Sequence, residues 1–340
     1  MELKVRRIVS LTSLKSLRFL GSLRFLGTWG VLLTIASCTT HTGEAEVAPA
    51  AIGFHTSRIE EVGTRALINN VDDLRAGFGV YGDKTVGTSS SPQLVFDNIK
   101  VSGTHWDYEP TKYWDRTAAY RFVAYAPWAG SGTSYISYDP DNKKLTINEI
   151  PQWKKIDGDE IDYLVATSAG TAEQYLSQPT NGTVNLQFKH ILAQLTVNIA
   201  KVSTAATYTV TGLSIESVPT GTCKCVYDSS NGSLSFSGST TGQPDLLTDA
   251  FEVGTSPETL AHYLVAPFDL GENEMKLSLT YTLGGGTSKT VPVPLGITKF
   301  ESNCSYVFNL RFEAGSNIRV SVTEVKNWAT SEVTDDVYNW

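Results

Sequence analysis

The stretch Met275-Lys276-Leu277-Ser278-Leu279-Thr280-Tyr281-Thr282-Leu283 decides the class of fold. Apolar side chains occupy every second position of this stretch, and polar side chains occupy the positions between them. Because successive side chains of a β-strand point to opposite faces, this period of two predicts a strand with one buried face and one solvated face. Gly284-Gly285-Gly286 follows directly and predicts a turn into a second strand over Ser288–Leu295.

Turn signals elsewhere in the chain predict further strand pairs of the same kind. Asn231-Gly232 is typical of a tight hairpin turn, and Pro140-Asp141-Asn142 is a second turn signal. The strand pairs predicted around these turns are 222–227 with 233–236, and 135–138 with 145–147. Helical periodicity is almost absent after residue 38. Short strands with polar turns between them predict an all-β chain built of antiparallel β-sandwiches.

Two tandem sandwich domains are predicted by a change of pattern near the middle of the chain. Ser177–Gly182 is rich in turn residues, and apolar residues then fall on even positions over 184–188 but on odd positions over 191–199. A strand cannot change phase without a bulge or kink, so we expect a kink at residues 189–191. The predicted boundaries are a signal peptide over 1–37, a linker over 38–50, a first domain over 51–182 and a second over 183–340.

The start of the chain has the form of a bacterial lipoprotein signal. A basic segment precedes a short apolar run from Trp29 to Ala36, which is too short to span a bilayer. Ile35-Ala36-Ser37-Cys38 then places small residues before a cysteine, as a lipobox does. We therefore expect cleavage before Cys38 and lipidation of its thiol, which would anchor the protein in a membrane outside the cytoplasm.

The charge of the chain excludes one class of partner. The net charge is −8, and removal of residues 1–37, with six basic residues and one acidic residue, would make it −13. Such a surface repels phosphate, so we expect no binding to nucleic acid.

Motifs that could carry catalysis or bind a cofactor are weak. Gly77-Phe78-Gly79-Val80-Tyr81-Gly82 matches G-x-G-x-x-G, but no helix pattern follows, so a glycine-rich strand end is the better interpretation. Asp157, Asp159, Glu160 and Asp162 lack the spacing of a calcium loop and predict an acidic turn. We expect no cofactor, no metal and no enzyme activity.

The sequence leaves the cysteine pairing open, whereas it places one histidine in the interior. One of Cys223 and Cys225 is expected to pair with Cys304 in an oxidising compartment, although the pairing is not fixed by the sequence. His190 shares a parity with Phe188 and is expected to be a hydrogen-bonded core histidine.

The aromatic run has two possible roles: it packs a core, which we favour, or it stacks on sugars at the surface. Its members are Trp106, Tyr108, Tyr113, Trp114, Tyr125 and Trp128, and Trp153 follows later in the chain.

Several stretches, taken in order, resemble the fimbrillin family of Bacteroidetes lipoproteins, which supply subunits of type V pili. Together they cover nearly the whole chain after the signal. The stretches are Ile52-Gly53-Phe54, Thr64-Arg65-Ala66, Phe78–Gly82, Val95–Asn98, Trp106-Asp107-Tyr108, Tyr113-Trp114, Phe122–Pro127, Leu186–Leu195 and Val325–Trp328.

The resemblance implies two transthyretin-like sandwiches and assembly by strand addition. A trypsin-like protease would cut after an arginine near the first strand, and removal of that strand would open a groove for a strand of another subunit. Arg65, followed by Ala66, matches the cleavage position, and Arg58 is a second possible site. Ile52 and Phe54 belong to the candidate strand, and Cys38 matches the lipidated position.

Two departures from the family pattern leave the place in a filament open. The tail Ala329–Trp340 is short for a donor strand of a shaft subunit, and the segment after Cys38 lacks a dense acidic patch. The prediction is thus a structural or adhesive pilus subunit (shaft, tip or accessory) at the outer membrane or in the fimbrium. Its expected partners are other fimbrial subunits, the outer membrane through lipid, and a host protein or glycan. The alternative is a membrane-anchored glycan-binding lipoprotein.

Overall fold

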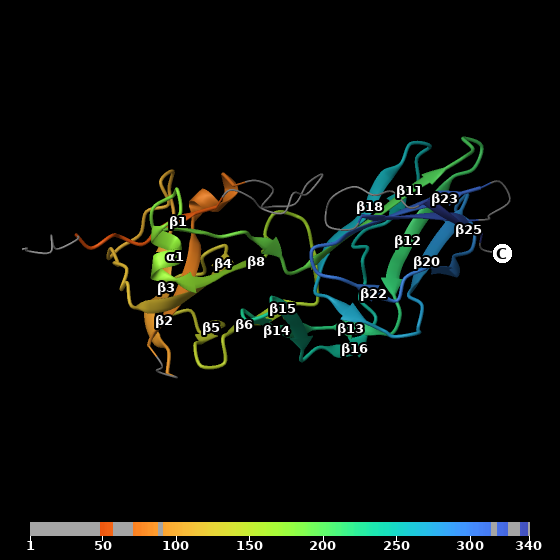
Figure 1. The fold of residues 1–340 in the computed structure, drawn as a ribbon. Helices are drawn as coiled ribbons and strands as arrows, with labels where there is room; N and C mark the ends of the chain where they lie inside the picture. Colours follow the sequence, from red (N-terminus) through yellow and green to blue (C-terminus); the bar gives the residue numbers. More distant parts are fainter. Residues whose placement is uncertain (1–47, 57–70, 88–90, 314–317, 326–333, 339–340) are drawn as a thin grey trace, which may run out of the picture. The chain divides into compact units, whose positions relative to one another are not determined.

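The structure, a computed structural model, describes residues 48–56, 71–87, 91–313, 318–325 and 334–338. The residues from Ala48 onward form one compact unit, and its described parts are almost entirely β-strand (Figure 1). Helical structure in these parts is limited to the short helix α1 (Ala172–Leu176) and the 3-10 turn η1 (Asp73–Ala76). The predicted all-β class is confirmed.

A five-stranded antiparallel sheet is the centre of the first half. Its order is β10 (Lys189–His190), β8 (Leu164–Thr171), β4 (Ala118–Ala126), β2 (Phe78–Val86) and β3 (Gln93–Val101).

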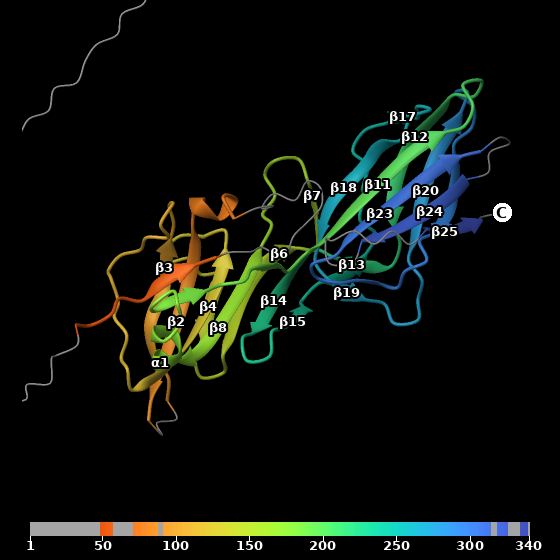
Figure 2. The ribbon, with the colours of Figure 1, turned by 45° about the horizontal axis from the view of Figure 1, so that its top comes forward.

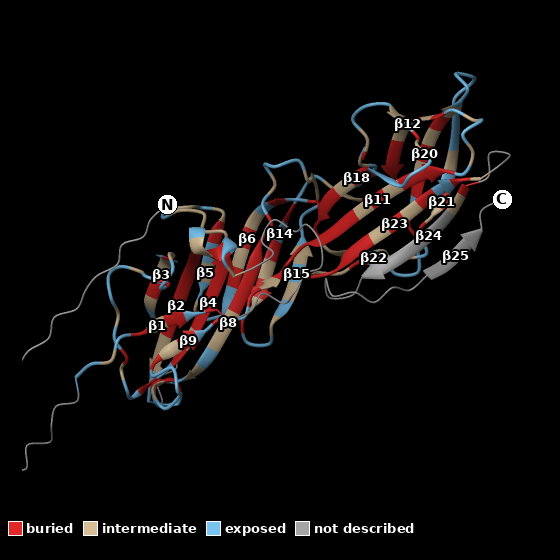
Figure 3. Cartoon of the chain, turned by 90° about the horizontal axis from the view of Figure 1, so that it is seen from above, coloured by how far each residue is buried: buried red, intermediate tan, exposed pale blue. Residues whose placement is uncertain are grey.

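Both faces of this sheet are buried along its central strands β2 and β4. Along β4, Tyr120, Phe122 and Ala124 pack into one core, whereas Val123 and Tyr125 pack into another on the opposite face. Figure 3 shows the resulting run of buried residues along β2 and β4. This burial explains why the sequence from Phe122 to Ala126 is apolar without alternation, as is typical of strands covered on both sides.

Two layers cover the two faces. One is a four-stranded sheet of β15 (Ser233–Ser237), β14 (Thr222–Asp228), β6 (Lys144–Pro151) and β5 (Ile136–Asp139). The other contains β1 (Gly53–His55) paired in parallel with β9 (Thr183–Asn185). The first layer consists of two hairpins, whose turns lie at residues 140–143 and 229–232, so both of these predicted hairpins are confirmed.

The second half contains a separate sandwich with its own core. Its six-stranded sheet has the order β25 (Thr334–Tyr338), β24 (Ile318–Val325), β23 (Ser305–Phe312), β11 (Ala193–Lys201), β18 (Glu258–Val265) and β7 (Trp153–Lys155) (Figure 2). Its four-stranded sheet has the order β17 (Phe251–Glu252), β12 (Tyr208–Ile215), β20 (Lys276–Leu283) and β21 (Lys289–Pro294). Two short pairs, β13 (Val218–Thr220) with β16 (Thr240–Gly242) and β19 (Phe268–Asp269) with β22 (Lys299–Phe300), complete it.

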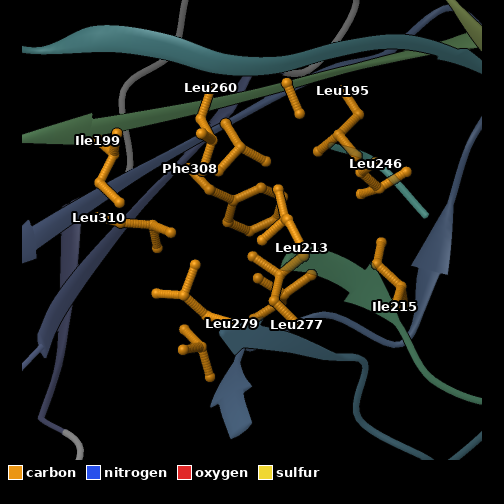
Figure 4. Close-up of a cluster of buried hydrophobic side chains, with 14 of the residues drawn as sticks. Leu195, Ile199, Leu213, Ile215, Leu246, Leu260, Leu277, Leu279, Phe308 and Leu310 are labelled. Atoms are coloured by element: carbon orange, nitrogen blue, oxygen red, sulfur yellow. The ribbon is translucent and has the colours of Figure 1, made fainter. Parts of the chain in front are cut away.

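Alternating residues of these strands fill the second core. Leu277 and Leu279 of β20 meet Leu213 of β12 and Phe308 of β23 between the sheets (Figure 4). The burial pattern of β20 alternates along the strand, as the opening stretch of the sequence predicts. Within this largely antiparallel half, β11 and β23 pair in parallel, which alternation alone does not distinguish.

The chain passes from one sheet to the other at the predicted kink. β10 ends at His190 in the five-stranded sheet, and β11 begins at Ala193 in the six-stranded sheet. His190 is fully buried, and its Nδ1 lies 2.9 Å from Oδ2 of buried Asp162, so the predicted core histidine is confirmed.

Strands from either side of the predicted boundary at residues 182 and 183 pair with one another. β14 extends the sheet that β6 begins, and β7 pairs with β18 at the edge of the six-stranded sheet. The boundary itself stays a prediction, but these pairings mean that each half contributes strands to the sheets of the other.

Two glycines of β2 allow aromatic rings to lie against the strand. A Cβ on Gly79 would lie 2.3 Å from the Tyr125 ring, and a Cβ on Gly82 would lie 3.0 Å from the rings of both Phe96 and Phe122. The G-x-G-x-x-G match is therefore a packing feature of a strand, as the sequence interpretation proposed.

We predict that Gly79→Ala lowers the free energy of unfolding by about 1–3 kcal/mol, because the new methyl group must displace the buried Tyr125 ring. Gly212→Ala in β12 is the matched control, since its Cβ would meet only the Thr280 side chain at 3.3 Å. Urea unfolding followed by tryptophan fluorescence checks this. Equal losses for the two variants would contradict the packing role of Gly79.

Candidate functional site

The candidate site is the place that β1 occupies. The residues of this segment alternate in burial: Ile52, Phe54 and Thr56 are buried, and His55 between them is exposed. This is the period of two that a strand over a core requires. The two residues that the sequence assigns to a candidate leaving strand, Ile52 and Phe54, are therefore the residues that bind the segment to the molecule.

Phe54 is the main apolar anchor of β1. Its ring lies edge-on to the rings of Phe96, Tyr108 and Phe122, with centroid distances of 5.3, 5.5 and 5.7 Å respectively. Only 4% of its surface is exposed. Edge-to-face contacts of this kind add to the stabilisation from buried area.

Backbone hydrogen bonds hold β1 along both of its edges. On one edge, Ile52 N donates to Lys112 O at 2.9 Å and Trp114 N donates to Ala50 O at 2.9 Å. On the other edge, Gly53 N donates to Gly182 O at 3.2 Å and Leu186 N donates to His55 O at 2.8 Å. In addition, the Tyr108 hydroxyl donates to Ile52 O at 2.7 Å.

Strand β1 is hydrogen-bonded along both edges and packs on aromatic rings with one face, so it occupies a slot between residues 112–114 and β9. Without β1, the backbone of residues 112–114 and that of β9 would lose their partners, and the rings of Phe96 and Phe122 would lose their cover. An extended segment with apolar residues at two alternate positions can replace each of these contacts. The arrangement thus has the requirements of a strand-binding groove that the chain's own segment already fills.

The remaining predicted site residues lie outside the described residues. These are Cys38, Arg58, Arg65 and Ala66, so lipidation and processing at these positions stay predictions.

Strand β25 lies in the tail that the sequence analysis considered too short for the donor strand of a shaft subunit. Thr334–Tyr338 pairs with Arg319–Thr323 of β24 and forms an edge of the six-stranded sheet. The tail was expected to be a poor donor because it is short and acidic, and it offers little alternation from which a strand could be predicted.

The tryptophans of the aromatic run serve mainly as core residues. Trp106 and Trp114 are 7% and 6% exposed. Trp128 is half-buried with Lys100 Nζ 5.1 Å from its ring centroid, and half-buried Trp153 donates to Pro219 O at 2.7 Å. Tyr113, which is 54% exposed, is the exception. The preferred core interpretation is confirmed for Trp106, Trp114 and Tyr125, which are buried.

The carboxylates of the acidic turn have ion-pair or hydrogen-bond partners within the protein. Lys154 Nζ forms ion pairs with Asp159 and, at 3.9 Å, with Asp157. Glu160 Oε2 accepts hydrogen bonds from the backbone N of Asp157 and Gly158 at 3.0 and 2.6 Å. Asp157, Asp159 and Glu160 therefore already have the partners that a cation would replace.

The prediction of a disulfide between Cys304 and either Cys223 or Cys225 is wrong. Cys223 and Cys225 pack in the core between the five-stranded sheet and its four-stranded cover, whereas Cys304 packs in the core of the second sandwich. No disulfide joins these three described cysteines. Burial raises the pKa of Cys223 to about 11 and that of Cys225 to about 12, which keeps both thiols protonated and unreactive.

We predict that Phe54→Ala lowers the free energy of unfolding by about 3–5 kcal/mol, because it removes three ring contacts and leaves a cavity. His55→Ala, on the exposed face of the same strand, is the matched control and should change stability little. Chemical denaturation of both variants checks this. A loss for Phe54→Ala no larger than that for His55→Ala would show that β1 is not anchored as described.

Three comparisons relate the chain to known proteins. A family model described as fimbrillin-like matches residues 64–328. No curated protein matches the chain. Within the described residues, no helix has the length and apolar character needed to cross a membrane.

Several solved structures are similar to the chain. A "putative cell adhesion protein" of Bacteroides uniformis shares 18% identity over 83% of this chain and 98% of its own, with a TM-score of 0.49. A second protein of that description, from Bacteroides eggerthii, shares 12% identity over 82% and 95%, with a TM-score of 0.46. A fimbrial assembly protein of Parabacteroides distasonis shares 11% identity over 79% and 94%, with a TM-score of 0.41. Since the family model covers most of the sequence, the chain belongs to the fimbrillin-like family.

Proposed function

We propose that this protein is a structural and adhesive fimbrial subunit at the cell surface, and that it assembles by strand addition. Membership of the fimbrillin-like family supports a pilus-subunit role, and the seating of β1 in a slot with two backbone edges supports the mode of assembly. The second of these observations carries the proposal. A slot that needs an extended strand with alternate apolar residues can take that strand from another copy.

Processing after Arg65 would cut the covalent link between the rest of the protein and β1 with everything before it. The covalent link between β1 and the rest of the protein runs through residues 57–70, which contain Arg58 and Arg65. After a cut at either arginine, only the ring contacts of Phe54, the burial of Ile52 and the edge hydrogen bonds would retain β1. Lipidation at Cys38 would therefore tether the subunit only until this cut.

The incoming strand needs a source, and β25 is the candidate. Among the described strands it pairs with β24 and lies at the edge of the six-stranded sheet, so its departure would break no other described strand pair. Sheet edges of this kind are the natural sites of pairing between chains. The subunit would then accept a strand at one end and donate a strand at the other.

We predict that an arginine-specific protease cuts the purified protein after Arg65, leaving Ala66 as the new N-terminus. The variant Arg65→Ala should resist this cut, and Arg58→Ala should still be cut there. N-terminal sequencing of the products checks both results, and sequencing of the protein recovered from cells checks whether the same cut occurs in vivo.

Assembly of the cut protein is a separate expectation. Size-exclusion chromatography should show oligomers after cleavage of the intact sequence, and monomers for a variant that lacks residues 334–340. A cut protein that stays monomeric under all conditions would contradict strand addition while leaving family membership untouched.

A further inference from the structure

A polar cavity of about 340 Å³ opens beside the five-stranded sheet, on the face opposite to β1. It is lined by the ends of β2 and β4, by Pro92 before β3, and by the β5–β6 turn at residues 140–143. Its volume is at the small end of the range of small-molecule sites, about 300–1,000 Å³. Nothing in the strand-addition mechanism uses this cavity.

Small side chains create the hollow. Thr85 and Ala119 lie opposite each other on β2 and β4, and both line the cavity. Asp83 and Arg121 form the next residue pair in the same register on this face. The lining on this face thus consists of a pair of small residues followed by a pair of charged residues, one carboxylate and one guanidinium.

Asp83 is a buried carboxylate at the cavity wall. It is 6% exposed, and its Oδ2 accepts a hydrogen bond from the Tyr138 hydroxyl at 2.7 Å. Burial raises the pKa of Asp83, although Tyr138, Arg121 and Lys143 act in the opposite direction. A buried carboxylate with a perturbed pKa in a cleft is a feature of many functional sites.

The groups around Asp83 are fixed in position by the protein itself. Arg121 Nη1 donates to Ser229 O at 3.1 Å, and the Ser229 backbone N and hydroxyl donate to Lys143 O at 2.9 and 2.8 Å. These bonds tie the turn at residue 143 to the turn at residue 229 and hold the guanidinium against Ser229. The other guanidinium donors of Arg121 have no protein partner within the described parts of the chain. A preorganised wall of this kind reduces the entropy lost on binding.

The balance of charge and shape indicates the class of ligand. Asp83 and Asp141 are matched by Arg121 and Lys143, so the lining is neutral overall and favours a neutral ligand over an anion. A carboxylate only accepts hydrogen bonds and a guanidinium only donates them, whereas a hydroxyl does both. Adjacent hydroxyls of one ligand can therefore bridge Asp83 and Arg121, and the rings of Pro92 and Pro140 give apolar wall surface for its C–H groups.

We propose that this cavity binds a neutral monosaccharide unit of a glycan through Asp83 and Arg121. The inference gives the adhesive part of the proposed function a ligand class and a location. It rests on the adhesive role and does not depend on strand addition, because the cavity and β1 lie on opposite faces of the sheet. A zwitterionic amino acid, which would place an ammonium on Asp83 and a carboxylate on Arg121, is the competing ligand.

The test is saturation-transfer NMR of the purified protein with the methyl glycosides of glucose, galactose, mannose and N-acetylglucosamine, and with alanine as the zwitterionic probe. We expect saturation transfer to at least one glycoside and none to alanine. Ala119→Leu should weaken the binding of that glycoside by about tenfold or more, because the side chain fills the hollow floor. Ala205→Leu, at an exposed alanine of a turn in the second half, should leave it unchanged.

Asp83→Asn provides the second variant. The amide oxygen of asparagine can still accept a hydrogen bond from the Tyr138 hydroxyl, so the fold should persist. A thermal unfolding measurement checks that it does. Loss of glycoside binding in this folded variant supports the proposal. The proposal is overturned if no glycoside binds, if binding survives both Ala119→Leu and Asp83→Asn, or if alanine binds in place of the glycosides. None of these outcomes affects cleavage after Arg65 or oligomer formation, so a failure here is distinguishable from a failure of strand addition.

Discussion

The structure depends on one constraint: the five-stranded sheet is apolar on both faces and must be covered on both. Val123 and Tyr125 of β4 are buried under one covering layer, and Tyr120 and Phe122 are buried under the other. An apolar face left in water would forgo about 25 cal/mol for each Å² of apolar surface. The rest of the first half can be understood as the means by which the chain supplies these two covers.

The two covers differ in how they are attached, and the difference has functional consequences. The four-stranded cover is made of hairpins from both halves, joined by the β6–β14 pairing, so it is tied into the fold at several points. The other cover depends on β1, a short segment near the start of the described chain. The cover that contains β1 is therefore the one that we propose is exchanged for an equivalent strand during assembly.

The sequence predicts the local elements well and the layers less well. Alternation in 275–283 and the turns at Asn231-Gly232 and Pro140-Asp141-Asn142 predict the strands correctly, since these signals are local. The double burial of β4 and the pairing of β6 with β14 depend on residues far apart in sequence. The short helix α1 could have been predicted, because Thr171 and Gln174 form a capping box. The Asp83–Arg121 cavity could not, since their proximity follows from register alone.

The most direct test of the account measures whether the slot of β1 accepts a strand in trans. A fluorescent peptide with the sequence of residues 48–56 is titrated into intact protein and into protein cut after Arg65, and fluorescence anisotropy reports binding. We predict binding to the cut protein alone, and a clear loss of affinity when the peptide carries Phe54→Ala. Binding that is absent from the cut protein, or that is indifferent to Phe54, would contradict the claim that β1 fills an exchangeable groove.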